Sequence, residues 1–243
     1  IINNLSSNKK KIIYGDRKTS YEEIFKNIKK INFYLKDLKK ARIALYCEKS
    51  DLYYAAVIAI LLSGNTWIQI PKSNPKDRNQ YIINESEIDL IIGDENLNYI
   101  KNKKQIKFNQ IINKNKYKDF EIKSPFSEND VACIFFTSGS TGKPKGVKIT
   151  YLNMISCLMH QIRNLKYKKN DIFSDFHDSS FVMSLVTILP CIYVGGSIVP
   201  FIRDTDKILA NKIIKKNKVS VLITVPSFMM VLDYQIKKKL KIN

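Results

Sequence analysis

The segment 136–147 reads FTSGSTGKPKGV and has the residue types and spacing of a phosphate-binding site. Its glycines allow the backbone to turn so that several N–H groups converge on one anion. Its hydroxyl groups can rotate to meet phosphate oxygens, and its lysines add positive charge. The segment therefore predicts a site for a triphosphate, whose expected contacts are Thr137, Ser138, Gly139, Ser140, Thr141, Gly142, Lys143, Lys145 and Gly146.

This segment is not the P-loop of kinases and GTPases. That loop reads Gly-x-x-x-x-Gly-Lys-Ser/Thr, and its last hydroxyl binds magnesium. Here Thr137 stands five residues before Gly142, and Pro144 follows Lys143. The alternative of an exposed polar loop without a ligand fits the composition, but it does not account for the ordered glycines directly after an apolar run. We therefore disfavour both alternatives.

The elements on either side of the loop must position it. Residues 130–136 form an apolar run, which predicts a buried strand that ends where the loop begins. Thr150 is the expected cap of a helix that starts at Tyr151. The apolar residues of this helix recur at helical spacing, which predicts a buried face made of Leu152, Ile155, Leu158, Ile162 and Leu165.

Strand and helix patterns alternate along the rest of the chain. Strands are expected at 42–47, 67–70, 90–93, 172–173, 197–199 and 219–225, and helices at 21–38, 51–62, 77–86, 185–194, 206–216 and after Pro226. Repeated strand–helix units predict an α/β fold with mainly parallel sheets flanked by helices. We expect a first α/β subdomain at 1–123, which ends in a Lys/Asn-rich connector at 98–123 with one or two short strands. A second α/β segment is expected at 124–243, opening with the phosphate-binding loop.

The net charge of +19 raises the question of nucleic-acid binding. Base recognition relies on bidentate arginine, and only five of the 41 basic residues are arginine. The lysines are also spread along the whole chain, as is typical of solvated charge. We therefore expect no specific nucleic-acid partner, although a Lys-rich nonspecific nucleic-acid binder stays an alternative.

The cysteines are separated from one another and lie in apolar surroundings, at Cys47, Cys133, Cys157 and Cys191. Such residues are typical of buried free thiols in a reducing compartment. No zinc-ligand spacing is present, so no metal-ligating residue is predicted. The apolar run 52–62 is shorter than the roughly 20 residues of a membrane span. With no signal-peptide pattern at residue 1, these features predict a cytoplasmic protein without a membrane span.

At this point the chain resembles a known family. Residues 137–146 are similar to the phosphate-binding signature of adenylate-forming ligases, which include acyl-CoA synthetases and carrier-loading adenylation domains. Residues 19–23, 61–71 and 221–227 resemble further elements of that family in the same order, and 190–200 most resembles D-alanine–carrier-protein ligases. The resemblance spans nearly the whole chain and implies the large N-terminal domain of such an enzyme.

The resemblance implies that ATP and a small carboxylic or amino acid react to an acyl-adenylate and pyrophosphate. A thiol then accepts the acyl group, with carrier-protein phosphopantetheine favoured over coenzyme A. Thr137 and Ser138 are the expected phosphate contacts, and Lys143 is the expected catalytic cation. Lys145 is either a second contact or a surface lysine. Mg²⁺ is implied by the polyphosphate and the family, but the sequence indicates no ligand for it.

One position departs from the family pattern. Members that activate amino acids carry Phe-Asp-x-Ser, in which the aspartate pairs with the substrate ammonium; Val182 stands at that position here. An ammonium next to valine would lose its counter-charge, which is unfavourable in a partly dry pocket. Either the substrate lacks an α-ammonium, or another group binds it. His177 and Asp178 are the candidates, although they could instead pack or cap at the start of the following helix.

Several family elements do not follow the loop in this chain. These are Tyr-Gly-x-Thr-Glu, the Thr-Gly-Asp ribose contact and the C-terminal domain with its lysine. We therefore expect an incomplete N-terminal domain that does not complete adenylation alone. A noncatalytic nucleotide-binding or interaction module of the same fold is the main alternative function.

Overall fold

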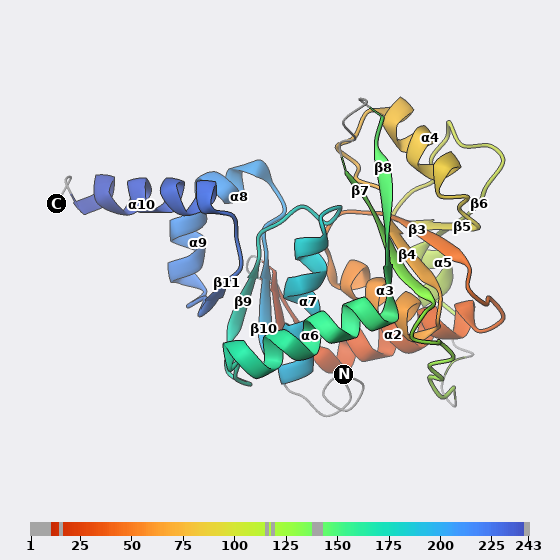
Figure 1. Cartoon of the computed structure of the whole chain (residues 1–243), viewed down its shortest axis with the longest axis horizontal. Coiled ribbons are helices and arrows are strands. Elements are labelled where there is room, and N and C mark those ends of the chain that lie inside the picture. Colours follow the sequence, from red (N-terminus) through yellow and green to blue (C-terminus); the bar gives the residue numbers. More distant parts are fainter. Residues whose placement is uncertain (1–10, 15–16, 115–116, 118–119, 138–142, 241–243) are drawn as a thin grey trace.

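The computed structural model of this chain describes residues 11–14, 17–114, 117, 120–137 and 143–240 (Figure 1). Its larger sheet has six strands in the order β6-β5-β3-β4-β7-β8. Their bounds are β3 Arg42–Tyr46, β4 Thr66–Gln69, β5 Leu90–Gly93, β6 Lys104–Lys107, β7 Val131–Thr137 and β8 Lys145–Thr150. These strands are parallel to their neighbours except for β7 and β8, which form an antiparallel pair.

The second sheet has five strands in the order β11-β9-β10-β1-β2. Their bounds are β1 Lys11–Tyr14, β2 Arg17–Ser20, β9 Ile172–Asp175, β10 Ser197–Pro200 and β11 Val221–Leu222. Only β1 and β2 are antiparallel in this sheet, within the described residues. The prediction of mainly parallel sheets flanked by helices is therefore confirmed. Each sheet draws strands from both sides of residue 123, and the proposed division into two subdomains there stays a prediction.

Three helices supply most of the core that lies between the sheets: α2 Tyr21–Leu35, α3 Asp51–Leu62 and α7 Val182–Val194. The nearly uniform apolar sequence of α3 suits this place, because both of its sides meet protein. Its start is capped by Ser50, whose hydroxyl accepts a hydrogen bond from the Tyr53 amide at 3.1 Å. Gly64 follows α3 with a φ of +72°, a conformation that glycine adopts without strain.

The helix α6 Tyr151–Leu165 crosses in front of α7 (Figure 1). Thr150 caps it as expected, accepting from the Asn153 amide at 3.2 Å. The prediction of its buried face is wrong in part. Of the five residues expected to be buried, Leu158 is buried and Ile162 is half-buried. The other three members are exposed at 44%, 38% and 56% of their surface: Leu152, Ile155 and Leu165. A helix on the outside of the molecule buries only the stripe that meets its neighbour.

The remaining helices are α4 Lys76–Glu85, α5 Phe108–Ile112, α8 Asp204–Ile208, α9 Ala210–Lys216 and α10 Pro226–Leu240. The expected helix 206–216 is interrupted at Leu209, and the expected strand 219–225 is reduced to β11. The connector 98–123 contains β6 and α5 rather than strands alone. No helix in the described part of the chain combines the length and apolarity that crossing a bilayer requires.

Candidate functional site

The strands β7 and β8 bring the two ends of the predicted phosphate loop together. Thr137 pairs with Lys145, and Phe136 pairs with Gly146. The exposed Thr137 hydroxyl reaches the Lys145 carbonyl oxygen at 3.5 Å, which is a weak hydrogen bond. The middle of the loop lies outside the described residues: Ser138, Gly139, Ser140, Thr141 and Gly142.

Two other predicted loop residues are placed by the hairpin. Lys143 is exposed and lies two residues before the start of β8. Gly146 packs closely on β7, because a Cβ atom there would lie 3.1 Å from Ile134 Cγ2 and 3.2 Å from Phe136 Cζ. The glycine at 146 is therefore explained by close packing against the neighbouring strand.

A cavity of about 630 Å³ lies where the hairpin faces the turn before α7. It brings together Thr137, Asp178 and Val182, three of the residues singled out from the sequence. Its other lining residues are Pro71, Ser73, Asn74, Arg78, Phe135, Phe136, Val147, Ile149, Ser180 and Phe181. The cavity is located at the carboxyl ends of β4 and β7, which is where open α/β sheets usually bind ligands.

Sequence reasoning missed the contribution of residues 71–78 to this cavity. Arg78, on α4, places a cation among the lining residues, and Asn74 adds an amide. In a parallel sheet the segments after β4 and β7 emerge at the same edge, and this much follows from the expected strands. That residues just after Pro71 lie near Thr137 follows only from the observed pairing of β4 with β7.

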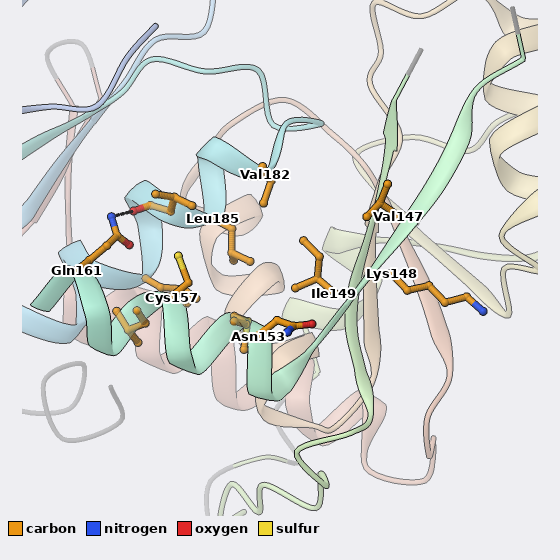
Figure 2. Close-up of a pocket in the computed structure, with 12 residues that line it drawn as sticks. Val147, Lys148, Ile149, Asn153, Cys157, Gln161, Val182 and Leu185 are labelled. Carbon is orange, nitrogen blue, oxygen red and sulfur yellow. Dashed lines mark hydrogen bonds between the residues drawn. The ribbon is translucent and has the colours of Figure 1, made fainter. Parts of the chain in front are cut away.

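A second cavity of about 370 Å³ lies between β8, α6 and α7 (Figure 2). In Figure 2, Val182 and Leu185 of α7 face Ile149 of β8, while the side chain of Lys148 extends away from the helices. This cavity shares Val147, Ile149 and Val182 with the larger one, so the two adjoin at these residues.

The second cavity is mainly apolar. Polar or sulfur groups come from Lys148, Asn153, Cys157 and Gln161. The Gln161 amide is engaged, since its Nε2 donates to the Val186 carbonyl oxygen at 3.3 Å. None of the described residues that line this cavity is acidic. It therefore suits an uncharged, largely hydrocarbon group better than an ammonium.

Asp178 organises the turn that leads into α7. Its Oδ1 accepts from the Ser180 amide at 2.8 Å and from the Ser180 hydroxyl at 2.7 Å. The cap position of α7 is Phe181, which makes no capping hydrogen bond through its side chain, so Asp178 is not the cap. One carboxylate oxygen of Asp178 is thus committed to the turn at the edge of the larger cavity.

His177 lies apart from the three residues that share the cavity. It is buried, its Nε2 lies 3.1 Å from the Ile223 carbonyl oxygen, and its ring packs edge-on against Phe176. Burial lowers the pKa of His177, and the hydrogen bond to the Ile223 carbonyl opposes this only in part. These contacts account for His177 as a packed residue behind the turn.

The cysteines and the charged residues provide no metal centre among the described residues. No group of three or more His, Cys, Asp or Glu side chains gathers there. Cys47, Cys133 and Cys191 are buried as expected, whereas Cys157 is exposed, which corrects the prediction for that residue. The exposed hydroxyl of Thr137 and the cation of Arg78 instead suit a polyphosphate, whose oxygens themselves bind divalent ions.

Comparison with known proteins gives the family and the fold of this chain. The family model described as AMP-binding enzyme matches residues 3–242. The D-alanine–D-alanyl carrier protein ligase of Staphylococcus epidermidis is 29% identical over 213 residues, which cover 86% of this chain and 43% of that protein. The chain therefore spans less than half the length of that ligase.

Two solved structures are similar to this fold. The N-terminal subdomain of Klebsiella oxytoca NpsA, in complex with 3-hydroxyanthranilyl-AMSN, matches with a TM-score of 0.78 and 21% identity, covering 91% of this chain and 57% of that one. The nonribosomal peptide synthetase FmoA3, in an AMPPNP-bound form, matches with a TM-score of 0.82 and 15% identity, covering 92% of this chain and 25% of that one. At these identities the two structures establish the shared fold.

Proposed function

The chain belongs to the AMP-binding enzyme family, and we propose that it forms the part of an adenylation domain that holds the phosphates of ATP next to a carboxylic acid. In the proposed reaction a carboxylate oxygen attacks the α-phosphorus of ATP. The bond from that phosphorus to the bridging oxygen breaks, and pyrophosphate leaves. A thiolate then attacks the acyl carbon of the acyl-adenylate, AMP leaves, and a thioester forms.

The observation that carries this proposal is the shared cavity of Thr137, Asp178 and Val182. Adenylation requires the reacting carboxylate and the α-phosphate to meet, so the residues that bind each must face the same space. Thr137 belongs to the phosphate loop, whereas Val182 follows it by 45 positions and begins helix α7, which packs against β9 and β10 of the other sheet. Their convergence supports a site that binds both groups together.

The loop residues would act on the charge that develops during the reaction. Negative charge grows on the departing pyrophosphate, and preorganised hydroxyl, amide and ammonium donors stabilise it. We assign this role to the hydroxyls of Thr137 and Ser138 and to the ammonium of Lys143, with the glycines 139 and 142 shaping the backbone. Arg78 is a further cation that lines the cavity. Mg²⁺ bound to the phosphate oxygens would add positive charge next to the departing pyrophosphate.

The acid that fits this site best has an apolar body and no α-ammonium. An α-amino acid would bring its ammonium close to Val182, while the Oδ1 of Asp178 is already bound by Ser180. The adjoining apolar cavity of about 370 Å³ offers room for a hydrocarbon group. For the acceptor we favour a phosphopantetheine thiol on a carrier protein over coenzyme A, because the ligase that matches this chain is named for a carrier protein.

The test is ATP–pyrophosphate exchange, measured on the complete polypeptide that contains this chain, with a panel of acids that differ in hydrocarbon length and in the α-amino group. We expect exchange with an apolar acid that lacks the amino group. Thr137→Ala and Lys143→Ala should each lower this exchange by about 100- to 1,000-fold. Lys26→Ala is the matched control, because Lys26 forms an ion pair with Glu22 on the exposed surface of α2 and does not line either cavity.

The possible outcomes separate the candidate functions. Exchange that is unchanged in both loop variants would refute the assignment of the phosphate site. Binding of ATP without acid-dependent exchange by the complete polypeptide would instead favour a noncatalytic nucleotide-binding module.

A further inference from the structure

Lys49 is a buried lysine whose ammonium is surrounded by oxygen atoms of the second sheet. Its side chain is 5% exposed. The Nζ atom donates to the carbonyl oxygens of Asp175 at 2.8 Å and Phe201 at 3.4 Å, and also to that of His177. The Asp175 carboxylate is fully buried and has its Oδ1 3.2 Å from the same Nζ. The other carboxylate oxygen accepts from the Tyr54 hydroxyl at 2.8 Å.

The place of Lys49 along the chain makes these contacts informative. Lys49 directly precedes Ser50, the cap of α3. A positive charge at the N-terminus of a helix is unfavourable, because the helix dipole is positive there. The charge of Lys49 therefore does not stabilise α3. The oxygen atoms that it contacts belong to the ends of β9 and β10 and to the turn after β9. Its charge is offset by segments more than 120 positions away.

One of these contacts holds the turn that forms the candidate site. The His177 carbonyl is followed immediately by Asp178, and Val182 begins α7 four residues after that. Lys49 thus links the start of α3 to the end of β10 and to the turn before α7, and of these three elements the turn lines the candidate cavity. A side chain with several donors is needed to hold three carbonyls at once.

We propose that Lys49 is a positioning residue, which sets the place of the turn 177–181 and thereby of Asp178 and Val182 in the acid-binding part of the site. This inference rests on the proposed function. A displacement of about 1 Å in a binding group can lower a reaction rate by about 100-fold. The loss of these hydrogen bonds should therefore be visible in the reaction with the acid, and not only in stability.

The experiment compares two neutral replacements of the ion pair, Lys49→Met/Asp175→Asn and Lys49→Gln/Asp175→Asn. Neither leaves an unpaired buried charge, which by itself would be strongly destabilising. The glutamine amide can donate to the carbonyls of the turn, whereas methionine cannot. We expect the methionine variant to raise the KM for the acid by about 10- to 100-fold, with little change in the KM for ATP, and the glutamine variant to recover most of this loss.

Two further measurements distinguish a positioning role of Lys49 from a general loss of stability, and one of them does not depend on catalysis. Tyr151→Phe removes a buried hydroxyl that donates to the carbonyls of Leu61 and Asn65, away from the cavity, and serves as a control for general destabilisation. Hydrogen–deuterium exchange of the amides 177–181 should become faster in the methionine variant than in the glutamine variant. This readout does not require turnover.

The outcomes distinguish this proposal from the proposed function. Absence of acid-dependent exchange in the unaltered protein contradicts the proposed function, while the amide exchange still tests the anchoring of the turn. Equal KM values and equal amide exchange in the methionine and glutamine variants would overturn the positioning role and leave Lys49 as a structural ion pair. If the methionine variant does not fold, a glutamine variant with the KM and amide exchange of the unaltered protein supports the proposal, and one with impaired values overturns it.

Discussion

Replacing Val182 with aspartate should shift the substrate preference toward α-amino acids. Val182 is the first residue of α7, lines both adjoining cavities and has 39% of its surface exposed. A carboxylate in the first turn of a helix is stabilised by the helix dipole by about 0.3–1 kcal/mol. The substitution therefore places a charge in the cavity without disturbing the fold.

The size of the shift follows from the exposure of this position. Two opposite unit charges about 4 Å apart attract by about 4 kcal/mol at an effective dielectric constant of 20. Because Val182 is partly exposed, water screens the new pair, and we expect about 1–3 kcal/mol to remain. This corresponds to a roughly 5- to 150-fold change in the relative kcat/KM of two substrates, at tenfold for about 1.4 kcal/mol.

The assay measures ATP–pyrophosphate exchange with pairs of acids that share one hydrocarbon body, such as leucine and 4-methylpentanoic acid. The quantity of interest is the ratio of kcat/KM for the amino acid to that for its partner. Val182→Asn is the matched control, because asparagine has the shape of aspartate without its charge. A folded aspartate variant whose ratio stays within about twofold of the unaltered protein would refute our account of the valine.

Three further predictions concern single residues. A maleimide should label one thiol per folded chain, at the exposed Cys157, because the other cysteines are buried and burial raises the pKa of Cys133 and of Cys191 to about 12. Tyr151→Phe should lower the free energy of unfolding in urea by about 1–3 kcal/mol, since two buried carbonyls lose their donor. Because the pKa of His177 is lowered in the folded state, its contribution to stability is present above about pH 6.5, the ordinary value for histidine, and is lost as the pH falls through the folded pKa. His177→Gln should therefore reduce the decrease of the urea midpoint between pH 7 and pH 5.

Each of these outcomes has a clear contrary result. Labelling of several thiols in the folded protein would contradict the burial of the other cysteines. A urea midpoint unaffected by Tyr151→Phe would show that its hydroxyl contributes nothing to stability. An equal pH dependence with and without His177 would show that other groups cause the loss of stability in acid.

Local patterns were sufficient to identify most elements of the fold. The apolar run before Thr137 and the uniform apolarity of 51–62 indicated a strand and a buried helix, and both lie where they were expected. Thr150 was identified as a helix cap because capping depends on neighbours only three residues away. The candidate phosphate loop could likewise be identified because it is one short contiguous segment. Val182 could be identified because it stands where the family pattern Phe-Asp-x-Ser has aspartate.

The tertiary structure decided what depends on residues far apart in the chain. The spacing of apolar residues on α6 predicted a buried face, but which of them are covered depends on where α7 packs, and Leu152 and Leu165 are left exposed. The hydrogen bonds from Lys49 to the end of β9 and the entry of Arg78 into the cavity have no local signature. The sequence alone determined the elements and the chemical groups available, because these follow from periodicity and residue type. Only the packing of the two sheets against the helices between them determined which of these groups face a common cavity.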